Sequence, residues 1–181
     1  MSEKNPEENS WIETREYPGS RLQPVLSAVM VLLALALFFL FLSGDVTFSA
    51  AIFFIFASLT FGVAILPQYL EFSGMSSDLA AQGMARARRH RGIKFVIPIA
   101  ALLSVLFVLP IAMVLIAPPF LFWDALTGIV AGFASFQLVF TLYVRRWSRS
   151  RGLKVSRYSM VSRNEGGKRV VTEYGLKAVK I

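Results

Sequence analysis

The chain has 181 residues, 55% of them hydrophobic, and a formal net charge of +8 from 19 Lys or Arg against 11 Asp or Glu. This composition is too apolar for an ordinary soluble domain, and a domain this small cannot bury several helices that are apolar all round. The absence of cysteine excludes a disulfide scaffold, a thiolate metal site and a cysteine nucleophile.

Residues 1–23 form a polar, acidic segment with too little apolar content to fold alone. Trp11 and Tyr17 are its exceptions, and an aromatic residue shortly before a membrane span usually lies at the level of the lipid headgroups. We therefore expect a cytoplasmic tail with an aromatic anchor. A peptide that docks on a partner is the alternative.

Four apolar segments follow, and each approaches or exceeds the roughly 20 residues that a helix needs to cross a bilayer. They cover residues 24–42, 46–70, 95–117 and 120–144. The first is not read as a signal peptide, because an acidic segment precedes it and no clear cleavage site follows. We expect no ionisable residue inside any span, with Asp45 and Asp124 in turn or cap roles at the outer face. A cation or carboxylate site formed by these two residues is the alternative.

The link Ser43-Gly44-Asp45 is so short that the first two spans should be antiparallel neighbours. In the second span, Ser58 and Gly62 form a small-x-x-x-small pair, which lets another helix backbone approach closely. In the third, Pro110 removes a backbone donor and should kink the helix.

The fourth span presents small residues on one face and a polar residue on roughly the opposite face. Gly128, Gly132 and Ser135 make the small face, whereas Gln137 is costly in hydrocarbon unless it is hydrogen-bonded. Because both faces require protein neighbours, we expect a partner outside this chain.

Two basic segments flank the last two spans. The middle loop, residues 71–94, reads as a short interfacial helix followed by a cluster of cations, and residues 145–181 form a basic tail with a β-hairpin over 155–163 and 168–177. The cations expected to meet anionic headgroups or a partner are Arg86, Arg88, Arg89, Arg91, Arg145, Arg146, Arg149 and Arg151.

The cations are distributed unevenly along the chain. The N-terminal tail holds three Lys or Arg, the middle loop five and the C-terminal tail 11, whereas the two other connections hold none. By the positive-inside rule, both termini and the middle loop are cytoplasmic, in a cell membrane or an equivalent energy-transducing membrane. The predicted fold is an all-α membrane protein with four transmembrane helices as two antiparallel hairpins, plus the short cytoplasmic β-hairpin.

No catalytic motif, cofactor motif or set of metal ligands is present in the sequence, so we expect no enzyme activity, cofactor or metal site. The predicted function is that of a non-catalytic accessory subunit or assembly factor of a larger membrane complex, with membrane subunits and anionic lipid headgroups as partners. A small homo-oligomeric channel or transporter is one alternative. Another is a membrane receptor for an anionic cytoplasmic partner such as the ribosome, although no RNA-binding motif supports nucleic acid as a partner.

Overall fold

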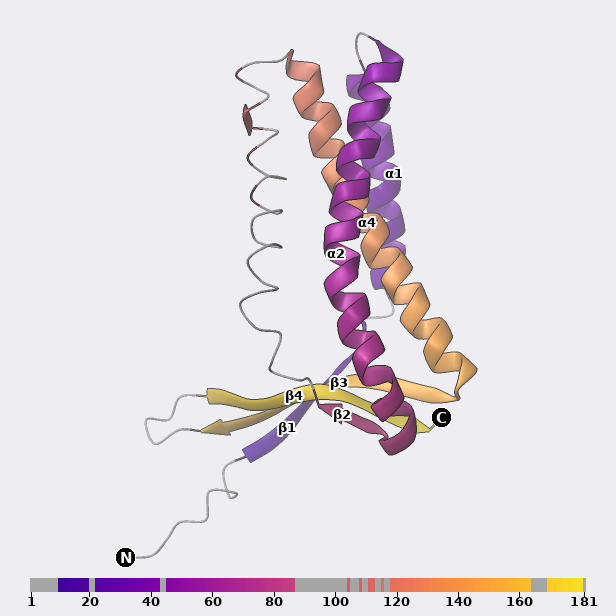
Figure 1. Cartoon of the computed structure of the whole chain (residues 1–181), viewed down its shortest axis with the longest axis vertical. Coiled ribbons are helices and arrows are strands. Elements are labelled where there is room, and N and C mark those ends of the chain that lie inside the picture. The colour runs from indigo at the N-terminus through magenta and orange to yellow at the C-terminus, as the bar shows by residue number, and fades with distance from the viewer. Residues whose placement is uncertain are drawn as a thin grey trace, which may run out of the picture. The chain divides into compact units, whose positions relative to one another are not determined.

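The computed structural model describes residues 10–19, 22–42, 45–86, 118–163 and 169–180, together with isolated helical positions at 104, 108, 111, 112 and 115. The chain divides into two compact units. The helical unit comprises residues 21–70 and 89–143, and the sheet unit comprises residues 1–20, 71–88 and 144–181. Figure 1 shows the course of the elements.

Three long helices account for the described part of the helical unit: α1 (Gln23–Phe41), α2 (Val46–Gln82) and α4 (Pro119–Ser150). Pro24 opens α1 in its first turn, where a missing N–H costs nothing. Asp45 caps α2, because its Oδ1 accepts hydrogen bonds from the backbone N–H of Thr47 at 2.8 Å and of Phe48 at 3.4 Å. α2 then continues through Pro67 to Gln82.

All three helices are long and apolar enough to cross a membrane. The prediction of four such helices is wrong, because the described residues contain three. The predicted span 95–117, with Pro110, lies outside the described residues except for isolated positions with helical backbone, all of them between residues 104 and 115. That prediction rested on apolar length, which is a criterion of composition and does not fix backbone geometry.

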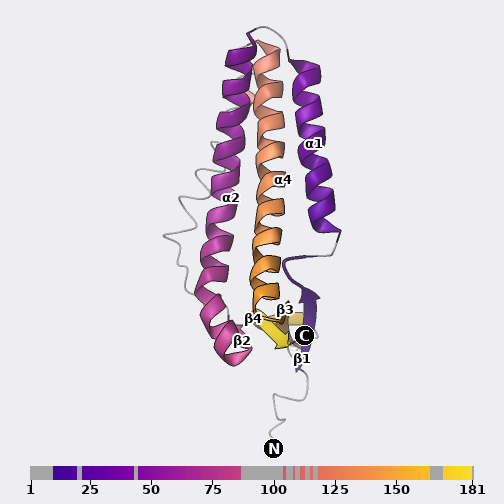
Figure 2. The ribbon, with the colours of Figure 1, turned by 90° about the vertical axis from the view of Figure 1, so that its right-hand side faces the viewer.

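Within the helical unit, α4 contacts both other helices, and in Figure 2 it lies between them. Phe38 of α1 meets Phe53 of α2 with ring centroids 4.6 Å apart, next to Ala131 of α4. At the far end of α1, Phe41 stacks on Trp123 of α4 at 4.7 Å. The neighbour of α1 on α4 changes from Ala131 at Phe38 to Trp123 at Phe41, so α1 and α4 are antiparallel, and Figure 2 shows that α1 and α2 also run in opposite directions. The short link between α1 and α2 predicted this antiparallel pair.

The sheet unit contains a four-stranded antiparallel sheet in the order β1-β3-β4-β2. Its strands are β1 (Ser10–Glu16), β2 (Met84–Arg86), β3 (Leu153–Arg163) and β4 (Arg169–Lys180). β3 and β4 pair as a hairpin with longer strands than expected, but the prediction of a two-stranded hairpin beside a polar tail is wrong. A lone hairpin is barely stable in water, and here β1 and β2 pair with its two edges.

The core of the sheet unit combines the sheet with the last turns of α2 and α4. Phe72 is fully buried, and it contacts Tyr17 at 6.2 Å between ring centroids and Trp147 at 5.3 Å. Tyr17 therefore belongs to a folded aromatic cluster and not to an unfolded tail. The side chain of Trp11 lies outside the described residues.

Candidate functional site

Helices α2 and α4 come into close contact at the two glycines of α4 that the sequence singled out. A Cβ atom on Gly128 would lie 2.5 Å from the backbone oxygen of Phe53, and one on Gly132 would lie 2.9 Å from the Cβ of Thr60 and collide with the backbone oxygen of Ala57. From the contact of Gly128 with Phe53 to the contact of Gly132 with Ala57, both helices advance by four residues in the same direction. α2 and α4 are therefore parallel, with their backbones in direct contact.

Asp124 lies one turn before Gly128, on the same face of α4. Asp124 is 1% exposed, and Ser49 of α2, which interacts electrostatically with it, is fully buried. Within the described part of the chain, the two carboxylate oxygens of Asp124 and the hydroxyl of Ser49 make no hydrogen bond. Because α4 begins at Pro119, the prediction that no ionisable residue lies inside a membrane-length helix is wrong. Asp45 has the expected cap role, whereas Asp124 does not.

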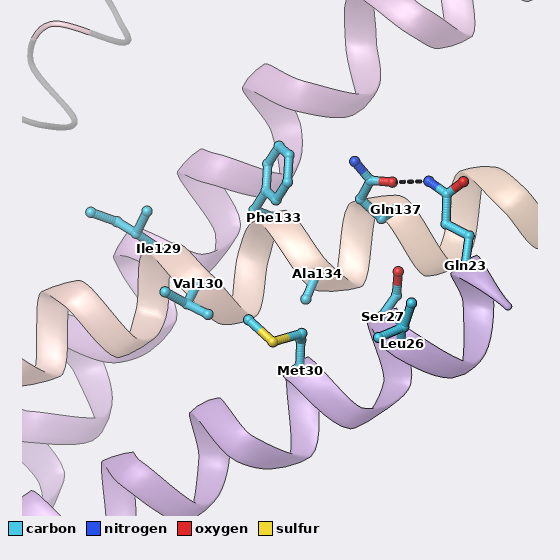
Figure 3. Close-up of a pocket in the computed structure, with 9 residues that line it drawn as sticks. All are labelled: Gln23, Leu26, Ser27, Met30, Ile129, Val130, Phe133, Ala134 and Gln137. Carbon is cyan, nitrogen blue, oxygen red and sulfur yellow. Dashed lines mark hydrogen bonds between the residues drawn. The ribbon is translucent and has the colours of Figure 1, made fainter. Parts of the chain in front are cut away.

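The face of α4 that carries Gln137 packs towards α1. The Nε2 of Gln23, the first residue of α1, donates a hydrogen bond to the Oε1 of Gln137 (Figure 3). Beside this pair lies a groove of about 390 Å³ between the two helices. Its other lining residues are Leu26, Ser27, Met30, Ile129, Val130, Phe133 and Ala134.

The two faces of α4 thus have neighbours within this chain, α2 on the glycine face and α1 on the glutamine face. This removes the premise from which we expected an external partner for α4. Ser135, the third residue of the small face, is half-buried, and the other predicted small pair lies elsewhere. Ser58 and Gly62 are exposed, and a Cβ atom on Gly62 would have nothing within 4 Å.

In the sheet unit, three side chains from β2, β3 and β4 form a polar cluster. The Tyr158 hydroxyl donates a hydrogen bond to Glu173 Oε1 at 2.8 Å, and Arg86 Nε lies 2.9 Å from the same oxygen. The Tyr158 ring packs over Gly175, where a Cβ atom would lie 2.9 Å from Cε1 of the ring. Burial, followed by the hydrogen bond and the negative charge of Glu173, raises the pKa of Tyr158, so its hydroxyl stays a donor at neutral pH.

This polar cluster borders a cavity of about 520 Å³ on one face of the sheet. Ile12, Met84 and Met160 supply apolar surface, and Asp78 and Gln82 of α2 close the remaining side. Sequence reasoning identified Arg86 as a contact for headgroups or a partner and missed Tyr158 and Glu173. The available signal was Glu173 itself, because a carboxylate inside a strand of an otherwise basic tail usually has a cationic partner.

Of the other predicted cations, none of those that the structure describes lines this cavity. Arg146, Arg149 and Arg151 are exposed near the end of α4, and the Arg151 guanidinium lies 4.5 Å from the centre of the Trp147 ring. Arg145 is half-buried and has a partner. The remaining three, Arg88, Arg89 and Arg91, fall outside the described residues.

Among the described residues, no group of three or more His, Cys, Asp or Glu side chains could hold a metal ion. Comparison with models of protein families, with curated proteins and with solved structures found no match. Function must therefore be argued from these arrangements alone.

Proposed function

We propose that the protein is a non-catalytic accessory subunit or assembly factor of a larger membrane complex. The observation that carries this proposal is the sheet, because its strands come from three separate parts of the chain that flank membrane-length helices. A folded module of this kind, rather than loose tails, offers a fixed surface on which a partner can dock.

The connections between strands and helices support one topology. β1 ends seven residues before α1 begins, β2 starts two residues after α2 ends, and β3 starts three residues after α4 ends. Since these strands share one sheet, the helix ends to which they are joined belong on the same side of a membrane. That side also carries most of the Lys and Arg residues, so the positive-inside rule makes it cytoplasmic, with both termini.

The charge of the sheet unit indicates the chemistry of the partner. Its residues include 15 Lys or Arg against nine Asp or Glu. Arg146 and Arg149 are exposed, as is Arg86, whose side chain is 80% exposed despite its contact with Glu173. A basic surface that is held next to a membrane suits an acidic segment of another membrane protein, with anionic headgroups around it.

Purification in a gentle detergent after mild crosslinking, followed by mass spectrometry of the chains that co-purify, tests this proposal. We expect one or a few membrane proteins in near-stoichiometric amount. Arg146→Glu with Arg149→Glu should release them, whereas the matched pair Arg146→Lys with Arg149→Lys should not, because it keeps the charge. Recovery of this chain only with itself would contradict the proposal.

A small channel or transporter is the second candidate, and Asp124 is the observation that favours it. A carboxyl buried between membrane-length helices is costly, and such residues usually mark an ion or substrate path. If this function holds, Asp124→Asn should abolish ion flux into vesicles that contain the purified protein. Asp45→Asn keeps a competent helix cap and should leave the flux unchanged. Equal flux in both variants would eliminate this candidate.

A further inference from the structure

The groove between α1 and α4 differs from an ordinary lipid-facing surface in having a polar end and an apolar interior. Gln23 and Gln137 form the polar end through their hydrogen bond, and apart from Ser27 the rest of the lining is apolar. Leu26 is 61% exposed, Met30 42% and Phe133 52%, so the groove is open along one side. Figure 3 shows how the lining side chains lie on the two helices.

The polar end lies where a membrane interface is expected. Gln23 is the first residue of α1, so this end of the groove coincides with the start of a membrane-length helix. From Gln137 to Ile129 the groove follows eight residues of α4, which is about 12 Å at 1.5 Å per residue. The hydrocarbon core is about 30 Å thick, so the groove is shorter than one leaflet.

The size of the groove selects among possible occupants. A transmembrane helix is about 10 Å wide and needs a contact face that crosses the whole hydrocarbon core. The 390 Å³ of this groove would hold only about one turn of such a helix. At about 30 Å³ for a water-sized or methylene-sized group, the same space holds about a dozen groups in a row, which corresponds to most of one acyl chain.

We infer that the groove between α1 and α4 binds one acyl chain of a phospholipid, with the glycerol and ester region at the Gln23–Gln137 pair. The hydrogen bond between the two amides leaves the Nε2 hydrogens of Gln137 and one N–H of Gln23 free to donate. Ester and phosphate oxygens accept such bonds, and the methylene chain then follows Met30, Val130 and Ile129 into the leaflet. This inference does not depend on a protein partner.

The test is native mass spectrometry of the full chain after it has been stripped of lipid in detergent and exposed to a phosphatidylglycerol. We expect one lipid to stay bound to the wild type. Met30→Trp should remove this adduct because the indole fills the groove. Leu33→Trp is the matched control, since Leu33 lies one turn further along α1, is 50% exposed and does not line the groove, and it should keep the adduct.

Two further variants separate groove binding from misfolding. Met30→Ala shortens a side chain that lines the groove, which widens the groove without blocking it, so this variant should keep the adduct. Gln137→Leu removes the polar end and should lower the bound fraction several-fold at the same lipid concentration. Equal binding by the wild type, Met30→Trp and Leu33→Trp would show ordinary boundary lipid and overturn the inference. The inference would also be overturned if the wild type retained no lipid, or if the bound species that Met30→Trp removes were a polypeptide and not a lipid.

Discussion

Replacing Gly132 or Gly128 by Ala should separate α2 from α4, because no space exists there for a methyl group. The Cβ of an alanine at position 128 would lie 2.5 Å from the Phe53 oxygen, whereas ordinary contacts begin near 3.4 Å. The backbones must therefore move apart by about 0.9 Å. Parallel backbone contact of this kind is a main source of attraction between helices in a membrane.

The magnitude follows from two opposing effects. Forcing a methyl group into a filled contact costs typically 1–3 kcal/mol, and replacing glycine by alanine inside a helix returns about 0.5–1 kcal/mol. We expect a net loss of about 1–2 kcal/mol for Gly132→Ala, and a similar loss for Gly128→Ala. Gly62→Ala is the matched control, because its methyl group meets nothing within 4 Å and only the helix-forming gain applies.

Reversible unfolding in mixed micelles, followed by circular dichroism as the denaturing detergent is increased, measures these differences. Gly132→Ala should unfold earlier than the wild type and Gly62→Ala at the same point or later. If Gly132→Ala unfolds no earlier than Gly62→Ala, the close approach of α2 and α4 is wrong, and so is the parallel register derived from it.

The other predictions concern four single residues. Burial, with the neighbouring charge of Glu71, raises the pKa of Tyr17 from 10.0 to about 12. The contribution of Tyr17 to stability is therefore complete below pH 10 and is lost as the pH rises from 10 to 12. Tyr17→Phe should flatten the dependence of unfolding on pH in that window, measured by circular dichroism. Phe72→Ala should destabilise the sheet unit by about 3–5 kcal/mol because Phe72 is fully buried among aromatic rings, and faster cleavage within the sheet by a protease would report it. Asp124→Leu should stabilise the helical unit by about 1–3 kcal/mol, since it removes a buried carboxyl without a hydrogen bond among the described residues. Asp45→Ala should destabilise α2 by about 1 kcal/mol, because the helix loses its cap. Thermal unfolding in detergent compares the two variants.

The helices of the helical unit were largely readable from the sequence because each depends on local information. α1 and the first part of α2 follow from charge-free runs of membrane length, and the short link between them sets their antiparallel pairing. The end of α2 was misplaced. Pro67 removes one backbone hydrogen bond, which a membrane helix tolerates when neighbouring groups satisfy the freed carbonyl, and the helix continues to Gln82.

The sheet could be predicted only in part, because most of its pairings join distant segments. β3 and β4 are adjacent in sequence and separated by turn residues, so their hairpin had a local signal. β1 has polar and apolar residues in an acidic segment, and β2 has only three residues, so neither was predictable as a strand from its own composition. Ser10 pairs with Ser162, and Met84 pairs with Lys177. No local sequence pattern specifies pairing between residues that lie so far apart in the chain.

The functional interpretation of α4 was limited in the same way. Periodicity placed Gly128 and Gln137 on different faces, but it could not say which helix would meet each face. We expected a partner outside the chain for at least one of them, whereas α2 and α1 occupy both. A residue pattern indicates that a face needs a neighbour. The neighbour itself depends on how the other helices of the same chain are arranged.

The order of strands also sets the order in which the sheet can form. Among the described strands, β1 is synthesised first but pairs with β3, and β2 pairs with β4, the last of these strands. The segments that hold β1 and β2 therefore remain without their sheet partners until residues 153–180 have been made, while the apolar helices between them can already enter a membrane. Because β3 and β4 are central in the described sheet, each of the two earlier strands needs one strand of this hairpin as its partner. The surface that we propose for docking therefore forms only after residues 153–180 have been made, whereas the charges on which the positive-inside rule depends are present in each segment as it is synthesised.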